Sequence, residues 1–318
     1  MISSTELARE CGISQGTVDR ALHNRPGVSP ATRERVLRAA RRHGYRPHPA
    51  ARELLTGQSK MVGAILPTVN NIFFMDLFNE IGRALAAQGL RLQITPVENR
   101  EAFLEALEDF AARRYRFVLA IPPEDNIAIP AQLASSLSIL TFLSSCRGKG
   151  VHFLSPDEEQ TGRDAVRYLH RKGHHRILHV TSSRRTYAIG ARTRGCRAMA
   201  AELALKLHVL VDLNAESLVQ ALETDRPTAI FCHNDWLALQ VLLLLSEKGV
   251  HVPEDISVLG VDNSPTLIAL HPNLTTMAYP MAETVGAVEK IFAGKIISLQ
   301  KERYKVIERA TVRSFPGN

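Results

Sequence analysis

The sequence of 318 residues has few cysteines, a single tryptophan and no long apolar segment. No two of its four cysteines (Cys11, Cys146, Cys196 and Cys232) lie at the spacing of metal ligands, and four are too few for a disulfide scaffold of this length. No run of 18 apolar residues occurs, and the N-terminus lacks the basic and apolar regions of a signal peptide. We therefore expect a cytoplasmic protein with free thiols, no membrane span and no metal site.

Two phosphate-binding motifs of nucleotide enzymes are also missing. The sequence contains neither Gly-x-Gly-x-x-Gly nor a P-loop, so a nucleotide phosphate would have no glycine-rich cradle. None of the twelve histidines belongs to a His-x-x-x-His pair with a flanking glutamate. We expect no catalytic residue and no cofactor. Hydrophobic residues nevertheless make up 45% of the chain, which is enough for a folded core.

Positive charge is distributed unevenly along the chain. Residues 1–60 hold eleven basic and five acidic side chains, a net charge of +6. The remainder holds 28 basic and 27 acidic side chains, a net charge of +1. A basic terminal segment on a near-neutral body is typical of a module that binds a polyanion. The charge alone is equally compatible with a solvated basic tail.

The basic segment carries start and stop signals for three short helices. A serine caps each helix, the first as part of a capping box and the third before a proline, and glycines end the first and third: Ser3, Gly12, Ser14, Ser29, Pro30 and Gly44. The second helix is predicted from Gln15 to about His23, and the third to about His43. Two short helices joined by a glycine-containing turn indicate a helix-turn-helix.

In a helix-turn-helix, the second helix enters the major groove with its N-terminal residues toward the base edges. Gln15 can read adenine with two hydrogen bonds, and Arg20 can read guanine. Ser14, Thr17 and Arg33 are placed to contact phosphates, which position the protein without reading sequence. The alternative is that Gln15 and Arg20 are ordinary solvated side chains.

At these residues the chain resembles the lactose repressor family of transcription regulators. The match runs through Gly12-Ile13-Ser14, Thr17-Val18, Arg20, Thr32-Arg33 and Gly44-Tyr45-Arg46-Pro47. The resemblance implies a helix-turn-helix head over residues 1–47, a hinge over 48–58 and an effector-binding core over 59–318. In the family, a hinge leucine wedges into the minor groove, which is a known way to kink DNA. Leu54 matches that leucine, and packing within a linker is its alternative role.

Three residues depart from the family pattern. Gly16 stands at a base-reading position of the DNA-binding surface and offers no side chain. Asp19 places a negative charge near the DNA backbone, and Glu53 beside Leu54 is unusual for a segment that enters the minor groove. The resemblance thus predicts the class of DNA-binding protein but not the operator sequence.

From residue 59 onward, short apolar runs alternate with amphipathic stretches. We predict strands at 61–67, 90–95, 117–121, 139–143, 177–181, 228–232 and 256–261, and helices at 76–88, 102–112, 157–171, 191–203 and 236–248. This alternation is typical of parallel, doubly wound sheets. The segment is long for a single sheet, so two α/β lobes are expected.

Polar and aromatic side chains follow several predicted strands. They lie at 70–74, 144–145, 182–183, 233–235 and 262–263. Because ligands of doubly wound folds bind outside the carboxyl ends of strands, these residues predict a cleft for a small polar molecule. Arg184 and Arg185 follow one strand, where they can meet an anion or lie in a solvated loop.

The body resembles the periplasmic sugar-binding-protein fold that forms the core of the same repressor family. The resemblance implies six effector-binding residues: Asn71, Phe73, Phe74, Arg192, Asn234 and Asp262. Asp262 would accept hydrogen bonds from sugar hydroxyls, Arg192 would donate them and Asn234 would do both. The rings of Phe73 and Phe74 would lie against apolar sugar faces. Core packing for the phenylalanines and helix capping for Asn234 and Asp262 are the alternatives.

The effector class is left open by one departure from the ribose-binder pattern. Ser144 and Ser145 replace an aspartate–arginine pair that such proteins usually carry after the corresponding strand. A different sugar, a polyol or a phosphorylated derivative are the remaining candidates.

Together these features predict a repressor-type transcription regulator. Its expected fold is a small all-α helix-turn-helix head plus an α/β two-lobed periplasmic-binding-protein-like body. The expected partners are double-stranded operator DNA, a small sugar-like effector and a second copy in a homodimer, because one head reads only a few base pairs. The alternative is an intracellular sugar-binding or sugar-processing protein without a DNA-binding role.

Overall fold

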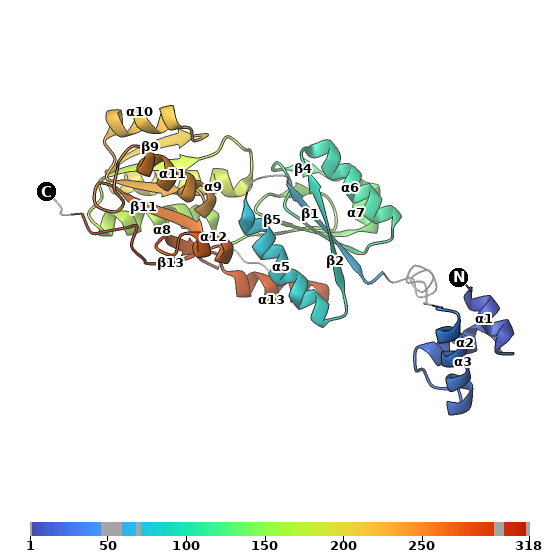
Figure 1. Ribbon diagram of the computed structural model, residues 1–318. Coiled ribbons are helices and arrows are strands. Elements are labelled where there is room, and N and C mark those ends of the chain that lie inside the picture. Colours follow the sequence, from blue (N-terminus) through green and yellow to red (C-terminus); the bar gives the residue numbers. More distant parts are fainter. Residues whose placement is uncertain (1, 46–58, 68–70, 296–301, 316–318) are drawn as a thin grey trace. The chain divides into compact units, whose positions relative to one another are not determined.

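We describe the protein from a computed structural model that covers residues 2–45, 59–67, 71–295 and 302–315 (Figure 1). The chain divides into two units, Met1–Ser59 and Lys60–Asn318, called here the head and the body. The predicted start of the body at residue 59 lies one residue from this division. The predicted hinge, including Leu54, lies outside the described residues.

Three helices form the head, as the capping signals predict. They are α1 (Ser4–Glu10), α2 (Gln15–Leu22) and α3 (Pro30–Arg42). Ser3 and Glu6 make the predicted capping box, and the hydroxyls of Ser14 and Ser29 accept backbone hydrogen bonds at the starts of α2 and α3. Leu7, Val18 and Val36, one from each helix, are fully buried in the core of the head. Local caps and one apolar stripe per helix therefore suffice to specify the head.

The first lobe of the body is a five-stranded parallel sheet in the order β2-β1-β3-β5-β7. Its main elements are β1 (Met61–Pro67), α5 (Ile72–Ala87), β2 (Arg91–Val97), α6 (Arg100–Ala112), β3 (Phe117–Ala120), α7 (Ala131–Ser136), β5 (Ser138–Phe142) and β7 (Val151–Leu154). Two short strands, β4 (Ile127–Ala128) and β6 (Cys146–Arg147), pair separately. Helix α5 begins four residues before its predicted start, because the side chain of Asn71 caps it.

The second lobe is a six-stranded sheet in the order β13-β12-β11-β10-β8-β9. Its elements are α8 (Glu158–Arg171), β8 (Arg176–Thr181), α9 (Tyr187–Glu202), β9 (Lys206–Val211), α10 (Ala215–Asp225), β10 (Ala229–Cys232), α11 (Asp235–Glu247), β11 (Ser257–Asp262), α12 (Pro265–Leu270), β12 (Thr275–Ala278) and β13 (Lys305–Ile307). The prediction of purely parallel sheets is wrong at one edge, where β13 runs antiparallel to β12. Between these two strands the chain leaves for the first lobe and comes back from it, so β13 enters the sheet at the end where β12 finishes and runs in the opposite direction.

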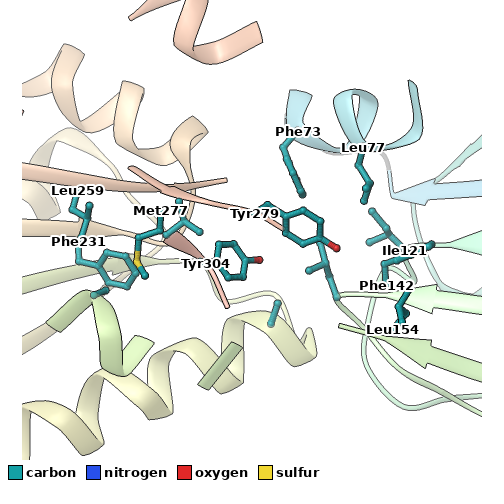
Figure 2. Packing of buried hydrophobic residues seen from close by; sticks show 14 of the residues in the cluster. Phe73, Leu77, Ile121, Phe142, Leu154, Phe231, Leu259, Met277, Tyr279 and Tyr304 are labelled. Atoms are coloured by element: carbon teal, nitrogen blue, oxygen red, sulfur yellow. The ribbon is translucent and has the colours of Figure 1, made fainter. Parts of the chain in front are cut away.

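The chain passes between the lobes three times, and the two cores meet at these crossings. After β12 the chain returns to the first lobe, where Phe292 of α13 (Met281–Phe292) stacks on Phe117 at 4.2 Å between ring centroids. Tyr279 precedes α13 and lies between Phe73 of α5 and Tyr304 of the last crossing (Figure 2). This buried aromatic row joins the two lobes beside the cavity described below.

No helix among the described residues is long and apolar enough to cross a membrane. Within the same residues, no group of three or more histidine, cysteine or acidic side chains is arranged to hold a metal ion.

Candidate DNA-binding surface and effector site

Helix α2 presents the predicted base-reading side chains at the surface of the head. Gln15 and Arg20 are both exposed. The amide of Gln15 donates to the hydroxyl of Ser4 at 2.7 Å, and the guanidinium of Arg20 donates to the hydroxyl of Thr17 at 3.2 Å. The Ser14 and Thr17 hydroxyls lie 2.9 Å apart at the start of the same helix. These polar groups are therefore held by bonds that a base or phosphate can replace.

The structure explains two of the departures from the family pattern. A Cβ at Gly16 would meet nothing nearer than the Ser14 hydroxyl at 4.0 Å, so the position is open surface. Asp19 forms ion pairs with Arg25 at 3.1 Å and with His23 at 2.9 Å. The negative charge that Asp19 brings to α2 is thus partly balanced within the head.

Arg33 has an internal role that the sequence analysis missed. Its guanidinium donates to the side-chain oxygen of Asn24 and to the backbone oxygen of Arg25. Both acceptors belong to the loop between α2 and α3, so Arg33 fixes that loop. A phosphate contact from Arg33 remains a prediction.

A cavity of about 230 Å³ lies in the body, and side chains of both lobes line it. All six residues predicted to bind the effector are on its wall: Asn71, Phe73, Phe74, Arg192, Asn234 and Asp262. Ile121, Leu143, Ile189, Trp236 and Leu237 supply much of the apolar lining. The structure thus brings the six residues to one place, and their contact with a ligand remains a prediction.

Arg192 is the most constrained of the six. Its Nε and Nη2 both donate to one carboxylate oxygen of Glu158, at 3.0 and 2.5 Å, and Nη1 donates to the backbone oxygen of His233. Nη2 also donates to the Tyr304 hydroxyl, which donates in turn to Glu158 at 2.9 Å. Burial opposes the charged guanidinium, but Glu158 outweighs it and the pKa of Arg192 is raised. Of five N–H donors, one on Nη1 is left for a ligand.

Asp262 ends β11 at the cavity wall with an unusual backbone conformation. Its φ is +111°, which is rare for a residue with a Cβ and indicates local strain. Burial and the neighbouring Asp235 raise its pKa well above the ordinary value, against the opposing effect of Arg192. The helix cap anticipated for Asp262 is supplied by Ser264 instead. Asp262 therefore keeps an oxygen available for another partner.

Three buried polar atoms on the cavity wall have no hydrogen-bond partner among the residues that the structure describes. They are the Ser144 hydroxyl, Nδ1 of His233 and Oδ2 of Asp262. Burial, Arg192 and His179 lower the pKa of His233 well below its usual range, so its imidazole is neutral. Buried polar atoms are nearly always paired, because leaving one unpaired costs about 1–3 kcal/mol. Their convergence on one cavity is what a ligand with several polar groups requires.

Asn234 and Phe73 carry out the alternative roles considered from sequence, and Asn71 has a capping role that was not anticipated. The side chains of Asn71 and Asn234 cap α5 and α11. Phe73 is 1% exposed and packs against Tyr279, whereas Phe74 is half-buried at the wall. Only a small part of Phe73 therefore remains for a ligand, while Phe74 offers more of its ring.

Asp235, beside Asn234, has a structural role that the sequence analysis did not assign. Its carboxylate accepts from the Thr276 hydroxyl at 2.6 Å and from the Ser264 backbone at 3.1 Å, tying α11 to β12 and α12. Burial raises its pKa to about 7, although these hydrogen bonds partly oppose the shift. The Asn-Asp pair thus contributes one cap and one buried acid beneath the cavity.

The buried acid predicts a pH dependence of stability. Asp235 holds its proton more tightly in the folded body (pKa about 7) than in the unfolded chain (about 3.8), so the free energy of unfolding should fall as pH rises from about 4 to about 7. Above that range its contribution is constant. In urea unfolding, Asp235→Asn should reduce the dependence of the free energy of unfolding on pH. The pH dependence that is left should come from Asp262, whose pKa is also raised. Glu216→Gln, at an exposed residue, serves as the control. A parental slope in Asp235→Asn would contradict the assignment.

Two family models match the chain in succession. Residues 5–48 match the lacI family of bacterial regulatory proteins, and residues 166–309 match a periplasmic binding protein-like domain. Catabolite control protein A of Priestia megaterium is 28% identical over 303 residues, which cover 89% of each chain. The transcriptional repressor PurR of Vibrio cholerae is 26% identical, with 99% of each chain covered. The repressor CytR of Escherichia coli is 28% identical over 292 residues.

The fold is also that of a solved repressor. The structure of the lac repressor dimer bound to operator and the anti-inducer ONPF matches with a TM-score of 0.83 at 22% identity, covering 98% of this chain and 99% of that one. Head and body together define a regulator in which a helix-turn-helix module accompanies a two-lobed ligand-binding domain. The chain belongs to the lactose repressor family, and it is a DNA-binding transcriptional regulator.

Proposed function

We propose that the protein represses transcription as a cytoplasmic homodimer on a palindromic operator, and that a small sugar-like effector in the body cavity sets its operator affinity. The observation that carries this proposal is the cavity, where residues of both lobes converge and three buried polar atoms lack partners within the described part of the chain. One head reads only a few base pairs, so two heads on two half-sites supply the affinity that an operator requires.

Hydrogen bonds between the lobes suggest how the effector acts. Asp76 of α5 accepts from the hydroxyls of Ser264 and Thr266 at the start of α12. On another side, the backbone N–H of Ala188 donates to the oxygen of Leu143 at 3.0 Å. An effector that fits one lobe angle better than another shifts the population toward it. Coupling of this kind is typically about 1–3 kcal/mol and acts equally in both directions.

The proposal is tested by operator binding with and without effector. A thermal-shift screen of sugars and polyols on the full chain finds compounds that stabilise it. Gel-shift titrations with a palindromic operator, selected from random DNA, then measure the affinity with each compound present. A chain that selects no sequence from random DNA would favour the alternative of a sugar-binding protein without a DNA-binding role.

Arg20 provides the sharpest test of DNA reading. Arg20→Ala should cost about 1–3 kcal/mol at the selected operator and relax specificity at one base pair, because a side chain that reads guanine is removed. Arg35→Ala removes the same charge from an exposed position of α3. It should weaken specific and non-specific binding alike, and an identical pattern for both variants would exclude base reading by Arg20.

A further inference from the structure

We propose that the effector is an anion, with a phosphate or carboxylate group that binds Arg184 at the wall of the cavity. This inference rests on the proposed function, since it assumes that the cavity is the effector site, and it adds the charge of the ligand. From the sequence, Arg184 could either meet an anion or lie in a solvated loop. Its place in the cavity lining favours contact with an anion.

The charges on the cavity wall do not balance. Arg184, Arg192 and Asp262 are the charged residues among those that line it. Arg192 is neutralised by Glu158, to which two of its nitrogens donate. Burial raises the pKa of Asp262, and no ion pair joins this carboxyl to Arg184. Among the described residues, the guanidinium of Arg184 therefore has no carboxylate paired with it.

Arg184 has almost no partner of its own. Its guanidinium donates one long hydrogen bond, at 3.4 Å, to the backbone oxygen of Pro123. Within the described part of the chain it forms no ion pair. The side chain is half-buried, and burial lowers its pKa without any carboxylate near enough to raise it. A partly desolvated cation is costly unless it is paired, and an anionic ligand would supply the pair.

The loop that carries Arg184 is held in place by hydrogen bonds. The hydroxyl of Ser182 accepts from the Arg184 backbone at 3.3 Å, and the Ser183 backbone donates to Asp212 at 2.9 Å. The backbone oxygen of Arg185 accepts from Asp125 of the other lobe at 2.7 Å. Arg184 is thus positioned at the wall rather than carried on an unanchored loop.

Neighbouring groups complete an oxyanion site. Ser182 and Thr186 line the same cavity as Arg184, and each hydroxyl accepts a backbone hydrogen bond and keeps its own O–H to donate. Hydroxyls and a guanidinium are donors that phosphate and carboxylate oxygens accept, and charge-assisted bonds are roughly twice as strong as neutral ones. The cavity volume of about 230 Å³ is below the usual range for ligand pockets, about 300–1,000 Å³, so the ligand is small. A monosaccharide phosphate or a sugar acid has the required size and charge.

The test compares matched neutral and charged ligands on the full chain. The probes are glucose, glucose 6-phosphate and gluconate; ribose, ribose 5-phosphate and ribonate; glycerol and glycerol 3-phosphate; and inorganic phosphate alone. Thermal shifts identify the compounds that bind, and calorimetry gives their dissociation constants. We expect a charged member to stabilise the parent more than its neutral counterpart does. Comparison of the sugar phosphates with the sugar acids shows whether the site prefers a phosphate or a carboxylate.

Two variants assign the effect to one residue. Arg184→Gln should weaken binding of the charged ligand by roughly 10- to 100-fold, the equivalent of one charge-assisted interaction. Arg185→Gln, at the exposed neighbour, removes the same charge and should leave the affinity nearly unchanged. Operator affinity without ligand should match the parent in Arg185→Gln.

The outcomes separate this inference from the proposed function. If a neutral sugar binds the parent and Arg184→Gln equally and alters operator affinity, the anion proposal is wrong while the regulator proposal stands. The anion proposal is also wrong if every charged compound, inorganic phosphate included, stabilises Arg184→Gln as much as it stabilises the parent. Failure to bind a specific operator would contradict the proposed function, independently of any ligand result.

Discussion

Arg192→Met should lower the free energy of unfolding of the body by about 3–5 kcal/mol. In the parent, two guanidinium nitrogens of Arg192 donate to the carboxylate of Glu158, whose side chain is 0% exposed. The variant leaves this buried carboxylate without its positively charged partner. Breaking a buried pair from one side is far more costly than removing both charges, because the remaining charge is desolvated and uncompensated. The backbone oxygen of His233 also loses a donor.

A double-mutant cycle and a control on the same helix isolate this effect. Glu158→Gln in the Arg192→Met background should recover a large part of the loss, because no buried charge remains. Arg194→Met removes an exposed ion pair with Glu159, at 3.4 Å, and should change stability by less than about 1 kcal/mol. Urea unfolding at pH 7 compares the parent, Arg192→Met, Glu158→Gln, the double variant and Arg194→Met. Equal effects of Arg192→Met and Arg194→Met would contradict the structural role.

The ion pair changes the meaning of the ligand prediction for Arg192. Four of its N–H groups are already used within the protein, so a lost response to effector in an Arg192 variant can follow from a loosened body. Asp262 is the better probe of ligand contact, because Oδ2 has no partner. Asp262→Asn keeps the shape of the side chain and tests the acid itself.

The sequence predicted best those elements that depend on contacts between residues close together in the chain. The head was predicted almost completely, because its caps and apolar positions act within three or four residues. In the body, seven strands were predicted from their apolar residues; six of them are largely buried, and β2 lies at a sheet edge. Strand β9, which also lies at a sheet edge with little burial, was missed. Strand β12 was missed because it is a four-residue strand that begins with two buried threonines.

The candidate site shows the same limit. Its six residues were matched by resemblance, and the structure places them around one cavity, three from each lobe. The partners of those residues were not predicted, because Glu158 reads as an ordinary acid in the first turn of a helix and lies 34 positions from Arg192. Tyr304 is farther still, on the last crossing between the lobes. Only the fold brings such distant groups together.

The close crossing of α8 and α9 depends on two glycines. A Cβ at Gly195 would overlap the backbone oxygen of Glu159, and a Cβ at Gly162 would overlap that of Arg192. Each glycine thus faces the backbone of the opposite helix, beside the pair of Glu158 and Arg192. The helices can approach this closely only where no side chain separates them.

Gly195→Ala should therefore lower the free energy of unfolding by about 3 kcal/mol, at the upper end of the usual cost of overpacking. The added methyl group meets backbone, which cannot rotate away, and separating the helices would lengthen the bonds between Arg192 and Glu158. Gly190→Ala on the same helix is the matched control, since its Cβ would meet only the mobile end of Arg194 at 3.4 Å. Alanine is favoured over glycine in a helix by about 1 kcal/mol, so Gly190→Ala should be neutral or stabilising. Urea unfolding should thus show a loss of stability for Gly195→Ala and none for Gly190→Ala. If Gly195→Ala is as stable as Gly190→Ala, α8 and α9 can accommodate a methyl group at their crossing, and the close packing argued above is wrong.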